Sequence, residues 1–190
     1  AFAGMTALIK EKPAEYINVC AVFDNEEIGS GTKQGADSTF LKDVLERICG
    51  RLGIGAEEYR CMLADSFLIS ADNAHALHPN HPEKADATNR PVLNGGIVIK
   101  YHGSQRYATD AFSAAVMKDI CNRAGVPYQS YANRSDIAGG STLGNISTAQ
   151  VSVNTVDIGL AQLAMHSSYE TAGAADIEHL ISALRTFYRD

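Results

Sequence analysis

The pattern of apolar and polar positions divides this chain into amphipathic helices and short apolar runs. The first twelve residues predict a helix, because four apolar side chains recur there at helical spacing: Phe2, Met5, Leu8 and Ile9. Residues 16–23 are apolar and β-branched, which predicts a buried strand. Residues 37–52 predict a second helix, with stop signals at Gly50 and Gly53.

Strands and helices continue to alternate through the rest of the chain. The remaining strand predictions are residues 67–70, 97–99, 127–132 and 153–158. The remaining helix predictions are residues 109–123, 141–150 and 172–188. Residues 73–94 are rich in His, Pro, Asn and Asp, which is typical of a loop. This alternation predicts an α/β fold, a three-layer α/β/α sandwich with a mainly parallel sheet.

Composition narrows the class of protein. At 190 residues and 45% hydrophobic, the chain is expected to form one globular domain. A net charge of -6 and the lack of clustered Lys and Arg argue against nucleic-acid binding. There is no apolar run long enough to span a bilayer, so we expect no membrane partner and a cytoplasmic location. The four cysteines show no CxxC spacing and are expected to be reduced thiols.

Acidic residues follow two of the predicted strands. Glu26 and Glu27 come after the run at 16–23, and Asp72 follows the run at 67–70. Ligands of α/β sheets gather at the carboxyl ends of strands, so these carboxylates are candidates for a shared site. Acidic residues are also common in solvated loops after strands, and that reading stays open at this point.

His166 is the histidine best placed to join these acids. It follows the apolar stretch 160–165 and precedes two serines, so it is expected in a turn before the last helix. Imidazole and carboxylate together suit zinc, cobalt or manganese. A structural histidine held by a hydrogen bond is the alternative reading.

Five sequence strings carry a resemblance to a known family. They are DNEEIGS (24–30), SADNAHALHPN (70–80), IKYHGSQRYATD (99–110), GGSTLGNI (139–146) and AQLAMHS (161–167). With these strings in this order, the chain resembles the aspartyl aminopeptidase family of dinuclear zinc aminopeptidases almost from end to end.

The resemblance implies a role for seven residues. Glu26 would be the general base, and the metal ligands would be Glu27, Asp72 and His166. The residues that would line the substrate pocket are His75, Lys100 and Tyr107, with Lys100 facing an acidic substrate side chain. The implied cofactor is a pair of zinc ions, with cobalt or manganese as alternatives. The implied substrate is a peptide with an acidic N-terminal residue.

The resemblance covers only the carboxyl-terminal portion of the family's catalytic domain. An upstream metal-binding segment and a lid domain of the family would lie outside residues 1–190, so we predict weak metal binding and little peptidase activity for this chain alone. The longer form is expected to be a homo-oligomer. The alternative is a non-catalytic α/β scaffold for assembly or small-ligand binding, although such a scaffold would be expected to have lost the site residues.

Overall fold

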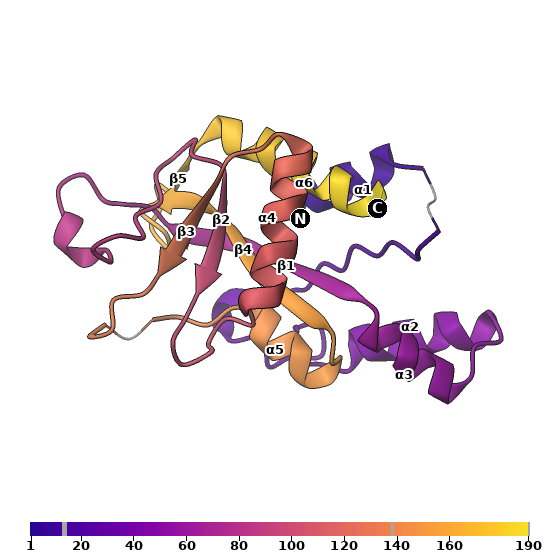
Figure 1. The fold of residues 1–190 in the computed structure, drawn as a ribbon. Helices are drawn as coiled ribbons and strands as arrows, with labels where there is room; N and C mark the ends of the chain where they lie inside the picture. Colours follow the sequence, from indigo (N-terminus) through magenta and orange to yellow (C-terminus); the bar gives the residue numbers. More distant parts are fainter. Residues whose placement is uncertain (13–14, 138, 190) are drawn as a thin grey trace.

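A computed structural model describes residues 1–12, 15–137 and 139–189. Its strands form one sheet in the order β1-β4-β2-β3, with β5 paired to β4 (Figure 1). The strands are β1 (Phe67–His75), β2 (Ile97–Tyr101), β3 (Tyr128–Ala132), β4 (Asn154–Leu163) and β5 (Thr171–Ala172). β1 is parallel to β4 and β2 to β3, whereas β4 is antiparallel to β2 and β5. The two longest ladders are therefore parallel.

The helices vary in how closely they approach the sheet. They are α1 (Phe2–Lys10), α2 (Phe40–Arg51), α3 (Ala56–Ala64), α4 (Ala111–Ala124), α5 (Leu143–Gln150) and α6 (Ala174–Arg189), with short 3₁₀ turns η1 (Glu26–Ile28) and η2 (Pro82–Lys84). Figure 1 shows α1 lying beside α6 and the α2–α3 pair projecting away from the sheet. Within the described ranges, no helix is long and apolar enough to cross a bilayer.

Alternation along the strands gives the sheet two different faces. Ile99 of β2 and Ile158 of β4 belong to the main core, which includes residues of α1, α4 and α6. On the opposite face, Val98, Ala74 and Ala161 form a smaller apolar cluster, and α5 packs against β1 and β4. Helices thus cover both faces, and the expected α/β sandwich is confirmed.

The strand predicted at residues 16–23 is wrong. This segment belongs to no strand among the described residues, and most of its side chains are exposed. Apolar, β-branched residues form a strand only when a neighbouring strand takes up their backbone hydrogen bonds. The described part of the chain supplies no such neighbour here.

Several element boundaries differ from the sequence predictions. β1 continues to His75, so Asp72 lies within the strand rather than after it. Helix α3 was not predicted. In α1 the buried residues are Ala3 and Ala7, because small side chains let this helix pack closely on α6. Glu11 then accepts charge-assisted hydrogen bonds from two arginines of α6, Arg185 and Arg189.

The cysteines are free thiols in very different surroundings, which predicts an order of reactivity. Cys61 is exposed, Cys20 is half-buried, and Cys49 and Cys121 are buried. Burial raises the pKa of Cys121 to about 12, so little thiolate forms there at neutral pH. With a thiol-specific chromogenic reagent at pH 8, we expect Cys61 to react first and Cys49 and Cys121 to react only after guanidinium unfolding. Equal rates for all four thiols in the folded chain would contradict this packing.

Candidate active site

A tight turn presents the adjacent acids Glu26 and Glu27. Asn25 adopts a left-handed backbone with φ of 61°, and Gly29 closes η1 with φ of 99°. The turn is held by the Ser30 amide, which donates to the Asn25 carbonyl at 2.9 Å. The Asn25 side chain also donates to the Thr32 hydroxyl at 2.9 Å. Local hydrogen bonds therefore fix this turn.

His166 meets Glu27 across a second tight turn, which follows β4. Its Nε2 lies 2.7 Å from Glu27 Oε2, and both side chains are about two-thirds exposed. Ala164 and His166 both have positive φ, 55° and 67°, and the His166 amide donates to Glu170 Oε1 at 2.7 Å. Left-handed residues other than glycine cost about 1–3 kcal/mol each and cluster at functional sites. This turn, with its two left-handed residues, positions the His166 imidazole against Glu27.

Asp72 faces Lys100 across the middle strand of the sheet. The Lys100 side chain, only 2% exposed, places Nζ 3.3 Å from Asp72 Oδ2 and 5.5 Å from the centre of the Tyr107 ring. Gly159 of β4 lies between them, paired in register with Asp72. A Cβ on Gly159 would sit 2.9 Å from Lys100 Cε and 2.8 Å from the backbone carbon of Asn73. The glycine therefore makes room for the Lys100–Asp72 contact.

This close approach predicts the effect of Gly159→Ala. The added methyl group collides with backbone as well as with Lys100, and such overpacking costs about 1–3 kcal/mol. Thermal unfolding should show a Tm lower by roughly 2–12 °C for a chain of this size. Gly50→Ala is the matched control, because a Cβ at this position in α2 meets no atom within 4 Å. A Tm for Gly159→Ala equal to that of the control would refute this account of the packing.

Glu26 lies within electrostatic reach of the other site residues. Burial raises its pKa, and the carboxylates of Asp72 and Glu27 raise it further. The positive charges of Lys100 and His166 act in the opposite direction. The structure therefore places Glu27, Asp72 and His166, from three separate parts of the sequence, within electrostatic range of Glu26, and among these four only Glu27 and His166 form an ion pair.

His75 and Tyr107 lie beside this group. His75 ends β1 and is exposed, yet partial desolvation of its ring lowers its pKa, as do the nearby charges of His166 and Lys100. Tyr107 is buried, and burial raises its pKa to about 12. Its ring stands edge-on to His102, with centroids 5.7 Å apart.

Asp157 supports this region, although the sequence analysis did not single it out. Its fully buried carboxylate accepts hydrogen bonds from the Ala108 amide at 2.6 Å and the Thr142 hydroxyl at 2.7 Å. It thereby joins the loop that carries Tyr107 to the start of α5. An acidic residue within the apolar run of β4 was the available sequence signal, because a buried charge requires partners.

The donor types at the Glu27–His166 contact fit zinc. Carboxylate oxygen and imidazole nitrogen are both zinc ligands, and here they already point at one another. Catalytic zinc sites generally use three protein ligands plus water. In residues 1–12, 15–137 and 139–189, no three His, Cys, Asp or Glu side chains are close enough to share one ion. Among the described residues, this contact therefore offers two donors of the types that zinc accepts, without a third beside them.

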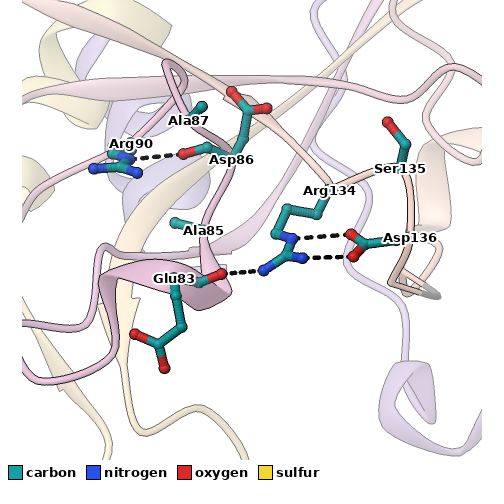
Figure 2. Close-up of a pocket in the computed structure, with 8 residues that line it drawn as sticks. All are labelled: Glu83, Ala85, Asp86, Ala87, Arg90, Arg134, Ser135 and Asp136. Atoms are coloured by element: carbon teal, nitrogen blue, oxygen red, sulfur yellow. Dashed lines mark hydrogen bonds and ion pairs between the residues drawn. The ribbon is translucent and has the colours of Figure 1, made fainter.

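A hollow of about 400 Å³ lies elsewhere, between the η2 region and the loop after β3. Figure 2 shows Arg134 reaching across it, ion-paired with Asp136 and donating to the Glu83 carbonyl. None of its lining residues belongs to the acidic site. Arg134 is already paired with Asp136, so its positive charge is not left unpaired for a ligand in this hollow.

The fold is that of an α/β protein in which a glutamate and a histidine from distant turns lie in contact, and comparison with known proteins gives the family. The family described as "Aminopeptidase I zinc metalloprotease (M18)" matches residues 1–188. A relative from Clostridium acetobutylicum, named a probable M18 family aminopeptidase 2, is 50% identical over 186 residues. The chain belongs to the M18 aminopeptidase family.

Solved structures agree with this assignment. An M18 aminopeptidase from Thermotoga maritima superposes with a TM-score of 0.89 at 26% identity, covering 99% of this chain and 43% of that one. The S. cerevisiae mApe1 dodecamer gives 0.84 at 31% identity, covering 98% and 42%. The match to the Clostridium relative covers 98% of this chain and 43% of the relative. The chain thus spans less than half the length of the relatives it matches.

Proposed function

We propose that residues 1–190 are the carboxyl-terminal portion of the catalytic domain of a zinc aminopeptidase that releases acidic N-terminal residues from peptides. The observation that carries the proposal is the Glu27–His166 contact of 2.7 Å, with Glu26 and Asp72 close by. Family membership supports the same chemistry.

Each residue then has a defined task. Glu27 and His166 would hold one zinc ion, and Asp72 would hold a second. Bound zinc supplies a Lewis acid that polarises the scissile carbonyl and makes water acidic. Glu26 would take the proton of the attacking water and return it to the leaving amine. Its raised pKa suits this role, because a stronger base accepts the proton more readily.

Lys100 would set the preference for acidic substrates. It is a buried cation whose ammonium group lies beside both Asp72 and the Tyr107 ring. His75 and Tyr107 would form the neighbouring walls of the pocket. A substrate carboxylate reaching Lys100 would gain a charge-assisted hydrogen bond.

A chimaera provides the test. Residues 1–190 replace the region that they match in the Clostridium acetobutylicum relative, and kcat/KM is measured on Asp-linked and Ala-linked chromogenic amides. Lys100→Ala should lower the Asp-to-Ala preference about 10–100-fold, since a hydrogen bond to a charged group is worth about 1.5–3 kcal/mol. Lys118→Ala on α4 is the control and should leave the preference unchanged. An unaltered preference in Lys100→Ala would remove Lys100 from the specificity role.

The chain alone should bind zinc and hydrolyse peptides less well than the chimaera. Residues 1–190 by themselves should bind zinc weakly and hydrolyse the Asp-linked amide slowly, because the described residues supply too few ligands. We further propose that the full-length protein forms a homo-oligomer in the cytoplasm. The dodecameric mApe1 neighbour supports the homo-oligomer. A non-catalytic scaffold would leave the chimaera inactive as well.

A further inference from the structure

Two tyrosines lie next to Lys100. The centre of the Tyr107 ring is 5.5 Å from Lys100 Nζ, and Tyr131 of β3 is paired in register with Lys100 of β2. The centres of the two rings are 6.4 Å apart, with an angle of 55° between their planes. Burial raises the pKa of both phenols, so both keep their hydroxyl protons at neutral pH. The direction of each O–H bond therefore decides which neighbour receives a hydrogen bond.

The side chain of Asn133, just after β3, is shared between these tyrosines. The Tyr131 hydroxyl donates to Asn133 Oδ1, which leaves the amide nitrogen Nδ2 as the second polar end of the side chain. That nitrogen is buried and has no partner at full hydrogen-bond distance among the described residues. Burial raises the pKa of Tyr107 to about 12, whereas the Asn133 side chain lowers it, as an N–H directed at the phenol oxygen does. Asn133 Nδ2 is thus directed at Tyr107 from beyond ordinary hydrogen-bond distance.

His102 is the other side chain near this nitrogen, but its ring cannot accept the N–H. A Cβ on Gly139 would lie 1.8 Å from Asn133 Nδ2 and 3.2 Å from His102 Nε2, so both nitrogens lie near the same point above this glycine. His102 Nδ1 accepts a hydrogen bond from the Ser104 amide at 3.0 Å. The neutral ring then carries its proton on Nε2, which is a donor. Because a buried N–H without a partner is unfavourable, the acceptor that remains for Asn133 among these side chains is the Tyr107 oxygen.

We propose that Asn133 is a positioning residue that sets the direction of a hydrogen-bond chain from Tyr131 to Tyr107, and so turns the Tyr107 hydroxyl proton toward the bound substrate. The Tyr131 O–H donates to Asn133 Oδ1, and the Asn133 N–H donates to the Tyr107 oxygen. The Tyr107 O–H is then left for an oxygen of the substrate. An amide can hold this direction, because one branch accepts and the other donates. The inference rests on the proposed function, in which Tyr107 lines the substrate pocket.

A double-mutant cycle in the chimaera tests this role through kcat/KM on the Asp-linked amide. Asn133→Leu keeps a branched side chain that neither accepts nor donates, and it should lower kcat/KM about 2–10-fold, the usual worth of one hydrogen bond. In the Tyr107→Phe background, which lacks the hydroxyl, the same substitution should cause no further loss. Asn122→Leu at an exposed position of α4 is the matched control and should leave kcat/KM unchanged. Equal losses in both backgrounds, as a merely structural role would give, or no loss in Asn133→Leu would overturn the proposal.

Urea unfolding of the 190-residue chain gives a second readout that needs no catalysis. Asn133→Leu should lower the unfolding midpoint more in the parent chain than in Tyr107→Phe, because the Asn133–Tyr107 interaction exists only in the parent. Equal shifts in the two backgrounds would contradict the hydrogen-bond chain. An inactive chimaera, combined with unequal shifts in the 190-residue chain, would count against the proposed function alone.

Discussion

Glu26→Gln in the chimaera is expected to lower kcat on the Asp-linked amide by about 10²–10⁴-fold, the usual contribution of a positioned general base. The amide keeps the size of the carboxylate but cannot accept a proton from water. Glu26 is within electrostatic range of Asp72, Glu27 and His166, so the substitution acts within the proposed site. Zinc content and Tm should stay close to those of the parent chimaera, because Glu26 is proposed as a base rather than a ligand.

The same substitution at a surface glutamate distinguishes loss of the general base from loss of one negative charge. Glu46→Gln removes a carboxylate on α2 that is paired with Lys42 at 3.0 Å on the surface. We expect its kcat to be unchanged. Wild-type activity in Glu26→Gln would exclude Glu26 as the base. Equal losses in both variants would indicate a general effect of net charge.

His166→Ala in the chimaera should lower zinc affinity far more than substitution of a histidine outside the proposed site. Removing residues that merely orient a ligand already costs about 10–100-fold in metal affinity, so loss of an actual ligand should cost more than ~100-fold. Competition with a chromogenic chelator measures the affinity in the chimaera. His81→Ala is the control, because His81 is an exposed loop histidine whose partner is Glu83. Equal zinc affinity in the two variants would show that His166 is not a ligand.

Much of the fold followed from local patterns, and its exceptions have a physical cause. The helix predicted at residues 109–123 forms as Ala111–Ala124, and Asp110 caps it by accepting a hydrogen bond from the Ser113 amide at 2.7 Å. The run at 16–23 has the composition of a strand, but pairing depends on residues distant in sequence or outside this chain. Helix α3 begins after Gly55, which has no side chain to cap it, and its apolar pattern is short, so little in its sequence marked it even though Glu58 accepts a hydrogen bond from the Gly55 amide.

The sequence indicated candidate site residues by their chemical type, but not how they would be arranged. Acids after an apolar run and a histidine in a turn indicated which residues to compare, and Glu27 and His166 lie in contact. The contact of Asp72 with Lys100 was not predicted. It depends on Gly159, whose missing side chain lets Lys100 cross β4. The support given by Asp157 likewise arises from tertiary packing, which brings together residues that lie 49 positions apart.

We propose above all that Glu27 and His166 together bind zinc in an M18 enzyme. Anomalous scattering at the zinc edge from crystals of the zinc-loaded chimaera tests it most directly. We predict a peak about 2.0–2.2 Å from a Glu27 carboxylate oxygen and from a His166 ring nitrogen. Zinc peaks located only away from these two side chains would contradict the account.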